Sequence, residues 1–338
     1  MPNELINNEL FIQPAKNPTN RILITGCNGM IGAALVKHLL AKEFSVSGTL
    51  REHLRPFSNE ALKDSSPIRQ FVVGDISEHT DWTEALKNID VVIHTAACVH
   101  QMQGSTDYDR VNYLGTYQLA KQAMQAGVKR FIFLSSIKAM GEQGHFDAFQ
   151  ACQPQDEYGQ SKLAAEQKLI ALSQQSGLEI VILRLPLIYG PGVKANFRKL
   201  IQMVKLFSEM RIPLPFKGVN NARSMMGLRN LVDLITCYIN HPNAAGKIYL
   251  PSDGKPISTP ELMQKIAKAL GESISLFFIP TSLLNVGFSI FGQKSLAERL
   301  LGDLTVDSCP IEENLSWQAP YTVDEELTYT MNSFANKK

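Results

Sequence analysis

The chain has 338 residues, of which 44% are hydrophobic and 19% are charged, and its formal net charge is +1. This composition is ordinary for a globular protein of two domains, and it lacks the basic excess that would indicate nucleic-acid binding. The five cysteines are scattered and odd in number, which argues against a disulfide framework and favours a reducing compartment. The histidine spacing shows no pattern that would indicate a metal site.

Residues 1–19 are polar and lack the basic start and apolar run of a signal peptide, so we expect a cytoplasmic protein with an N-terminal extension. The longest apolar stretch, residues 283–291, is too short to span a bilayer, so we expect no membrane insertion. This stretch is expected to be a packed helix, and contact with a membrane surface is the alternative.

The first half of the chain alternates short apolar runs with longer helical patterns. Continuous rather than alternating apolar strands predict a parallel sheet covered on both faces, and right-handed crossovers make it doubly wound. The expected strands are Arg21–Thr25, Ser45–Leu50, 70–73, Val91–His94, 130–134 and 179–183. The expected helices are Met30–Ala41, 81–87, 111–126 and 157–175.

Prolines and glycines cluster after residue 185, which predicts a smaller and less regular lobe. Helices are expected near 194–209, 230–240 and 260–270. Capping residues mark two helix starts, Asn230 with Asp233 and Ser258 with Glu261. We therefore expect an α/β fold with a Rossmann domain at 20–185, a substrate lobe mainly at 186–330 and a tail at 331–338.

A glycine-rich loop joins the first strand to the first helix. Gly26 permits a tight turn, Gly29 lets a pyrophosphate approach the backbone, and Gly32 lets the helix pack close to the strand. The free N–H groups at the start of the helix favour phosphate. This placement predicts dinucleotide binding, rather than a ligand-free loop, by the segment Gly26, Cys27, Asn28, Gly29, Met30, Ile31 and Gly32.

The second strand ends in Leu50 and Arg51, where an acidic residue would bind the adenosine ribose of NAD. A guanidinium there favours the 2′-phosphate of NADP, so we expect NADP over NAD. A solvated arginine, adenine stacking by Arg51 and ribose binding by Glu52 are the alternatives. Asp75, after the third strand, is expected to accept from the adenine amino group or to be a turn residue.

Tyr158 and Lys162 lie four residues apart on an expected helix, so both side chains share one face. A nearby ammonium lowers the pKa of a phenol, which could then act as an acid or base toward a carbinol or carbonyl. Ser136 ends the preceding apolar run, where this class of sheet carries its chemistry. These three residues are the predicted catalytic group, and Ser136 is preferred to Ser135.

The ordered motifs together resemble the extended short-chain dehydrogenase/reductase family of nucleotide-sugar epimerases, dehydratases and reductases. They are the glycine loop, Gly74-Asp75-Ile76, His94-Thr-Ala-Ala97, Val111-Asn112 with Gly115-Thr116, the double serine and Tyr158-xxx-Lys162. The resemblance implies catalysis by Ser136, Tyr158 and Lys162. It also implies cofactor contacts from Ile76, Ala96, Ala97 and Asn112, and a homodimer formed through helices 111–126 and 157–175.

The resemblance also implies a UDP-sugar substrate. Asn196 and Arg223 match residues that bind the nucleotide diphosphate in relatives, and Arg299 is a weaker candidate of the same kind. Their alternatives are an N-cap asparagine and a solvated arginine. Lys138 follows the serine where most relatives have a different sequence, and it could contact the sugar or lie on the surface.

Three functions follow, and no metal is expected in any of them. The leading hypothesis is a 4-ketoreductase for UDP-linked deoxyhexosamines in bacterial polysaccharide assembly. Leu50-Arg51 favours NADPH and therefore reduction, and Ser135-Ser-Ile-Lys138 with Gly190-Pro-Gly-Val-Lys-Ala-Asn-Phe197 resembles that subgroup. The second is a UDP-hexose or UDP-N-acetylhexosamine 4-epimerase with bound NAD. The third, from another class, is a non-catalytic dinucleotide-sensing scaffold.

Overall fold

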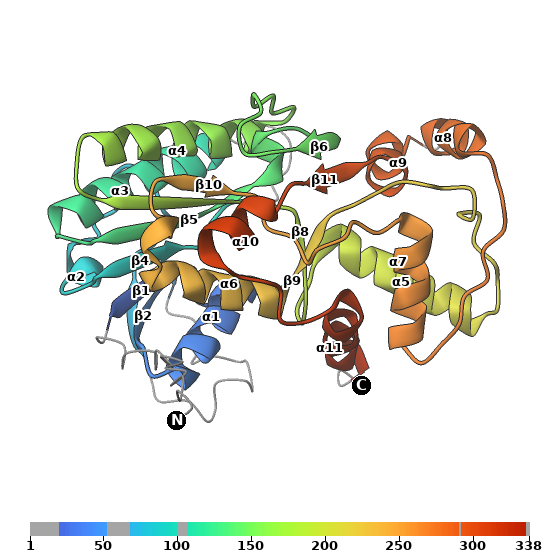
Figure 1. Cartoon of the computed structure of the whole chain (residues 1–338), viewed down its shortest axis with the longest axis horizontal. Coiled ribbons are helices and arrows are strands. Elements are labelled where there is room, and N and C mark those ends of the chain that lie inside the picture. The colour runs from blue at the N-terminus through green and yellow to red at the C-terminus, as the bar shows by residue number, and fades with distance from the viewer. Residues whose placement is uncertain (1–19, 53–67, 100–106, 291, 336–338) are drawn as a thin grey trace, which may run out of the picture.

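A seven-stranded parallel sheet forms the centre of this computed structural model, which describes residues 20–52, 68–99, 107–290 and 292–335 (Figure 1). The strand order is β10-β7-β5-β4-β1-β2-β3, so the chain builds one half of the sheet outward from β1 and then the other half from β4. The predicted doubly wound fold is confirmed. The strands are β1 Arg21–Thr25, β2 Ser45–Leu50, β3 Arg69–Val72, β4 Val91–His94, β5 Arg130–Ser136, β7 Glu179–Leu185 and β10 Lys247–Tyr249.

Helices cover both faces of the sheet, which is why its strands are continuously apolar. The apolar side chains of α1 and α6 form one core with one sheet face, while α2, α3 and α4 form a second core with the other face. The first group is α1 Met30–Ala41, α6 Leu228–Asn240 and α10 Cys309–Leu315. The second is α2 Thr83–Leu86, α3 Thr116–Gln125 and α4 Glu157–Gln174.

The lobe has its own core, formed by apolar side chains of α5, α7 and α11. Two short strand pairs, β8 with β9 and β6 with β11, lie where the lobe meets the sheet (Figure 1). The lobe helices are α5 Ala195–Glu209, α7 Thr259–Ala269, α8 Thr281–Ile290, α9 Lys294–Leu301 and α11 Val323–Ala335. The short strands are β6 Gly144–Phe146, β8 Leu187–Tyr189, β9 Met225–Gly227 and β11 Leu304–Val306.

The chain returns to the sheet after it has entered the lobe. Helix α6 packs beside α1, and β10 pairs in parallel with β7 at the sheet edge. The sequence analysis did not foresee β10, because a three-residue strand at an edge has too little pattern to identify. The predicted extension, residues 1–19, lies outside the described residues, while α11 continues to Ala335.

One of the two predicted helix starts is confirmed. The Ser258 hydroxyl accepts a hydrogen bond from the Glu261 amide and caps α7. The start at Asn230 is wrong, because α6 begins at Leu228 with Gly227 as its N-cap. The Asn230 amide is buried and instead bonds to Asp253 and to the backbone of Tyr321, so this side chain fastens a loop.

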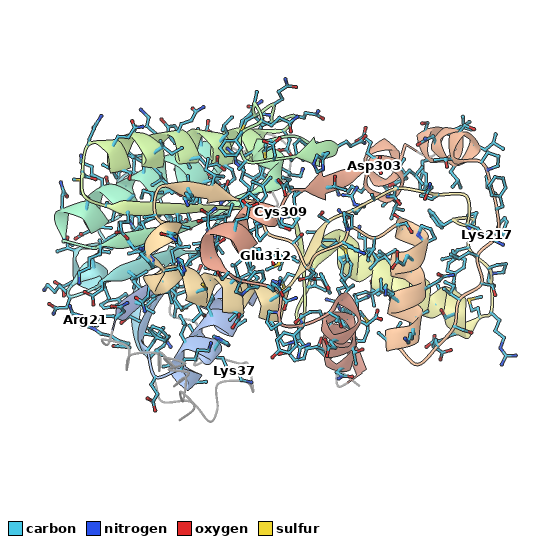
Figure 2. The ribbon with its side chains drawn as sticks, in the orientation of Figure 1. Arg21, Lys37, Lys217, Asp303, Cys309 and Glu312 are labelled. Atoms are coloured by element: carbon cyan, nitrogen blue, oxygen red, sulfur yellow. The ribbon has the colours of Figure 1, made fainter. Side chains whose placement is uncertain are left out.

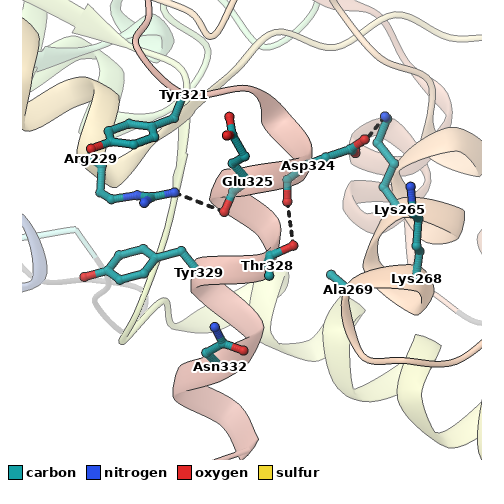
Figure 3. A pocket seen from close by; sticks show the side chains of 10 residues that line it. All are labelled: Arg229, Lys265, Lys268, Ala269, Tyr321, Asp324, Glu325, Thr328, Tyr329 and Asn332. Carbon is teal, nitrogen blue, oxygen red and sulfur yellow. Dashed lines mark hydrogen bonds and ion pairs between the residues drawn. The ribbon is translucent and has the colours of Figure 1, made fainter.

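The C-terminal helix α11 is held against the start of α6 by one arginine. The Arg229 guanidinium lies between the rings of Tyr321 and Tyr329 (Figure 3), 3.8 Å and 4.5 Å from their centroids. It also bonds to buried Glu326. A cavity of about 480 Å³ opens beside this clamp, between α7 and α11, and none of the predicted site residues lines it. The clamp is a structural feature of the lobe.

Helix α8 differs from the packed helix expected at 283–291. Leu284 and Phe288 pack against the lobe core, but no residue of α8 is buried. Leu283, Val286 and Ile290 are 61%, 55% and 76% exposed. Within the described ranges no helix combines the length and hydropathy needed to cross a bilayer.

Candidate active site

The predicted dinucleotide loop has the geometry that its three glycines require. Gly26 adopts a φ of 63°, which side chains disfavour, and a Cβ on Gly32 would lie 2.3 Å from the Gly26 carbonyl oxygen. Gly29 is exposed at the N-cap of α1, where no side chain covers the first backbone N–H groups. These N–H groups are free to bind a pyrophosphate, so the loop fits the predicted cofactor.

A buried hydrogen-bond chain fixes the strand ends behind this loop. The His94 ring bonds to the hydroxyls of Thr25 and Thr116, at 2.7 Å and 2.9 Å. Burial, together with the charge of Lys162, lowers the pKa of His94 to about 3, so the ring is neutral. The Ala96 amide donates to Thr25 Oγ1, and this holds Ala96 against Gly26 of the glycine loop.

Arg51 and Asp75 form an ion pair with each other across the ends of β2 and β3. The sequence analysis gave these residues separate roles at the adenosine end of a dinucleotide. Both side chains are exposed, Arg51 at 70% and Asp75 at 47%, so either can still meet a ligand. This ion pair neutralises part of the positive charge of Arg51, on which the expectation of NADP rests.

Tyr158 and Ser136 meet although they come from different elements. Ser136 ends β5 and Tyr158 lies in the first turn of α4, and the Ser136 side chain lies close enough to the phenol to lower its pKa. The ring of Tyr108 packs edge-on against Tyr158, with centroids 5.9 Å apart. The end of β5 and the start of α4 therefore bring the Ser136 and Tyr158 hydroxyls near each other.

Asn112 lies in a π-helix, Tyr108–Gly115, that precedes α3. Its buried amide bonds to both backbone groups of Cys98 and to the Ser161 hydroxyl. The sequence pattern predicted a helix from 111 to 126 without this wider turn. Single π turns often occur at functional sites, and this one aims Asn112 toward the chain that follows β4.

Lys162 is buried beneath the tyrosine. Its ammonium donates to the Leu134 carbonyl oxygen at 2.9 Å and lies 4.6 Å from the centroid of the Phe133 ring and 6.0 Å from that of Tyr158. Burial lowers the pKa of Lys162 to about 7, although Glu166 opposes the change. Lys162 therefore carries only part of its charge near neutral pH.

The expected lowering of the phenol pKa is wrong for this structure. Burial raises the pKa of Tyr158 to about 12, which outweighs the opposite effect of Ser136. The physical reason is that desolvation penalises phenolate more than Ser136 stabilises it, and Lys162 is not among the groups that shift this pKa. The phenol is therefore protonated near neutral pH.

The sequence analysis missed a buried ion pair behind the catalytic residues. Glu166 and Arg184 are 1% and 5% exposed, and Arg184 donates to Glu166 at 2.7 Å. Ser135 also bonds to Glu166, so this serine is structural while its neighbour Ser136 faces Tyr158. Two signals were available: Glu166 lies one turn after Lys162, and Arg184 interrupts an otherwise apolar strand.

The Lys138 side chain is neither unpaired in the site nor solvated on the surface. Its ammonium pairs with Glu142 at 2.6 Å and with Asp156 at 2.5 Å, and its amide donates to Ser136 Oγ. Asp156 is the N-cap of α4 and accepts from the Gly159 amide. Lys138 therefore ties the serine turn to the helix that carries Tyr158.

The predicted diphosphate residues lie in the lobe. Arg223 is half-buried and bonds to the Gly302 carbonyl, while Arg299 and Asn196 are exposed on α9 and in the first turn of α5. Burial lowers the pKa of Arg223, and the positive charge of Arg299 adds to the effect, so the two guanidiniums lie close together. Two adjacent guanidiniums favour an anion between them.

Comparison with known proteins gives matches over most of the chain. Residues 22–250 match the model of the NAD dependent epimerase/dehydratase family. A UDP-glucose 4-epimerase of Vibrio cholerae is 40% identical over 324 residues, which are 93% of this chain and 95% of that protein. A 3-beta-hydroxysteroid dehydrogenase of Mycolicibacterium neoaurum is 28% identical over 75% of this chain and 71% of that protein.

Solved structures share the fold at low identity. The UDP-glucuronic acid 4-epimerase from Bacillus cereus, in complex with NAD, gives a TM-score of 0.73 at 20% identity, over 94% of this chain and 97% of that chain. MoeE5, in complex with UDP-glucuronic acid and NAD, gives 0.71 at 21% identity, over 94% and 100%. These likenesses confirm the Rossmann architecture.

Proposed function

Because this chain belongs to the NAD dependent epimerase/dehydratase family, we propose that it reduces C4 of a 4-keto UDP-sugar. The observation that carries the proposal is the end of β2, where Leu50 and the exposed Arg51 stand in place of a carboxylate and favour NADPH, a reductant. A ketone accepts hydride at carbon and a proton at oxygen, so its reduction needs an acid at the site. Oxidation of a carbinol would need the phenolate instead.

Each catalytic side chain has one role in this proposal. A nicotinamide dinucleotide held on the Gly26–Gly32 loop supplies the hydride. Tyr158 gives its proton to the alkoxide oxygen at C4, and Ser136, whose side chain lies close to the phenol, orients that oxygen. Lys162 contacts the nicotinamide ribose and replaces the proton that Tyr158 has lost.

NADP is the cofactor that we propose in preference to NAD. The end of β2 carries Leu50 and the exposed Arg51 rather than a carboxylate, and a guanidinium suits a 2′-phosphate. The ion pair with Asp75 weakens this preference, because a 2′-phosphate must compete with that carboxylate. Ile76 and Asn112 complete the proposed cofactor contacts, together with Asn28, Met30, Ile31, Ala96 and Ala97.

The UDP group is assigned to the lobe. Arg223 and Arg299 hold the diphosphate between their guanidiniums, and Asn196 adds an amide. Lys138 is paired with Asp156 and does not contact the sugar in this proposal. Its effect on the substrate is indirect, because it holds the helix that carries Tyr158. The proposal places the cofactor on residues 20–185 and most substrate contacts on 186–330.

The assembly proposed from family likeness is a homodimer through α3 and α4, which lie side by side on one face of the sheet. Surface polysaccharide biosynthesis is the proposed biological setting, because 4-keto UDP-sugars are precursors of deoxyhexosamines. Gel filtration with light scattering tests the assembly. A monomer, or a dimer unaffected by Ile170→Glu on the exposed side of α4, contradicts it.

A UDP-hexose 4-epimerase is the second candidate. The 40% identical relative from Vibrio cholerae bears that name, and the Arg51–Asp75 ion pair is compatible with NAD. An epimerase would use Tyr158 first as a base and then as an acid, with NAD kept in place through both steps. The two functions share every catalytic residue and differ in whether the cofactor is consumed.

The assay is incubation of the purified protein with a UDP-4-keto sugar and NADPH, followed at 340 nm. We expect NADPH oxidation equal to the alcohol formed. Interconversion of UDP-hexoses without added cofactor, together with no NADPH oxidation, would establish the epimerase. Full biological activity of Tyr158→Phe would instead favour the scaffold hypothesis.

A further inference from the structure

Helix α8 carries two apolar stripes, and only one of them is packed. Leu284 and Phe288 lie four residues apart and face the lobe core. Leu283, Val286 and Ile290 lie on a second stripe of the same helix and are more than half exposed. A helix with apolar side chains on two faces is expected to bury both faces in apolar surroundings.

The exposed stripe belongs to a larger apolar surface at the end of the lobe. Phe277 and Phe278, just before α8, are 44% and 66% exposed. The Lys217 amide donates to the Phe277 carbonyl, and Thr281 Oγ1 donates to the Gly218 carbonyl, so the chain before α8 and the loop after α5 lie side by side. Figure 2 shows Lys217 at this end of the molecule, away from the Rossmann sheet.

The charges of this end are unusual in two ways. The sequence contains no charged residue between Glu272 and Lys294, so the whole of α8 is uncharged. The adjoining chain from 205 to 217 carries exposed Lys205, Arg211 and Lys217, with Glu209 as its only acid. Exposed Leu206, Met210 and Ile212 alternate with these charges.

We propose that this lobe end, formed by α8, Phe277, Phe278 and the chain from 205 to 217, docks on an anionic lipid bilayer. Leu283, Val286, Ile290 and the two phenylalanines enter the headgroup region, where an uncharged helix loses no ion hydration. Lys217 and Arg211 meet the acidic headgroups, and their long stems allow the charges to stay at the surface.

A second copy of this chain fits the same surface less well. A symmetric dimer through this end would bury the same positively charged patch of both copies in one interface, because a two-fold contact uses the same surface of each subunit. Anionic headgroups supply the opposite charge without that repulsion. The contact is peripheral, and it is independent of the sugar and of the direction of the reaction proposed above.

The test is flotation of the full-length protein with vesicles of phosphatidylcholine alone and of phosphatidylcholine with phosphatidylglycerol. We expect the protein to float with the anionic vesicles, and binding to fall when salt is raised. The variant with Leu283→Ser, Val286→Ser and Ile290→Ser should bind at least tenfold less. Lys217→Glu with Arg211→Glu should weaken binding to the anionic vesicles only.

A control removes an exposed apolar side chain elsewhere, Phe149→Ser, and should bind as the unmodified protein does. Thermal unfolding midpoints within a few degrees show that all variants fold. Failure of the unmodified protein to bind anionic vesicles overturns the proposal, as does equal binding by the triple variant. A triple variant that changes the oligomeric state without lipid assigns the surface to a second copy instead.

Discussion

The Lys138 ammonium lies 2.5 Å from Asp156 Oδ2, two residues before Tyr158, and it partly offsets a carboxylate whose charge raises the pKa of the phenol. The groups around Tyr158 are Asp156, Tyr108, Cys98, Ser136 and Lys162. Lys138 is the only cation among the described residues that is paired with Asp156. The ion pair with Asp156 therefore lets Lys138, which lies outside the predicted catalytic group, affect the pKa of Tyr158.

Lys138→Met should raise the pKa of Tyr158 further, because the charge of Asp156 is then uncompensated. In the direction of alcohol oxidation, which requires phenolate, activity rises with pH through this pKa. The rise should move to higher pH by roughly half a unit to one unit, measured as kcat/KM against pH. Lys138→Arg should restore the profile, and Lys87→Met, at an exposed pair, should leave it unchanged. An unshifted profile in Lys138→Met contradicts the link.

Tyr158→Phe should lower kcat by about 10²-fold to 10⁴-fold, because the neighbouring Ser136 hydroxyl is a much weaker acid than a phenol. Cofactor affinity, measured by fluorescence titration, should change little, since the glycine loop and Lys162 are intact. A variant that keeps most of its kcat would remove Tyr158 from the chemistry.

Glu166→Ala should destabilise the fold strongly, because it leaves Arg184 buried without its partner. The expected loss is about 3–5 kcal/mol in the free energy of unfolding, measured in urea. Glu84→Ala removes an exposed partner of Lys87 and should cost less than about 1 kcal/mol. Similar losses in both variants would show that the buried Glu166–Arg184 pair stabilises the fold no more than the exposed Glu84–Lys87 pair does.

Arg51→Ala should weaken NADPH binding more than NADH binding, by roughly tenfold in the ratio of the two Kd values. Asp75→Asn should act in the opposite sense, because it releases the guanidinium from its ion pair and removes a negative charge. Isothermal titration with each cofactor measures both effects. Equal changes for the two cofactors in Arg51→Ala would defeat the 2′-phosphate argument.

The sequence predicted most of the sheet. Buried parallel strands are continuously apolar, so β1, β2 and β4 were placed with their observed bounds, and the glycine loop marked the start of α1. Ser136 and Tyr158 were expected near each other because one lies where a strand ends and the other where a helix begins. The pattern of residue types contains this information directly.

Other features depend on the environment of a side chain, which the sequence does not contain. The pKa of Tyr158 was predicted in the wrong direction because its burial and its distance from Lys162 depend on packing. Asparagine often caps helices, but the Asn230 side chain instead donates hydrogen bonds to Asp253 and to the Tyr321 carbonyl. The pairing of Arg51 with Asp75 arises because β2 and β3 are neighbours, and the charge of each residue alone could not show it.

The most direct test of net reduction uses NADPH with deuterium at the transferring position of its nicotinamide. The product of a UDP-4-keto sugar is then examined by mass spectrometry and NMR. We predict one deuterium per product molecule, at C4, with one NADPH consumed, and none of this label in Tyr158→Phe on the same timescale. UDP-sugar product that forms without deuterium and without loss of NADPH would contradict the account.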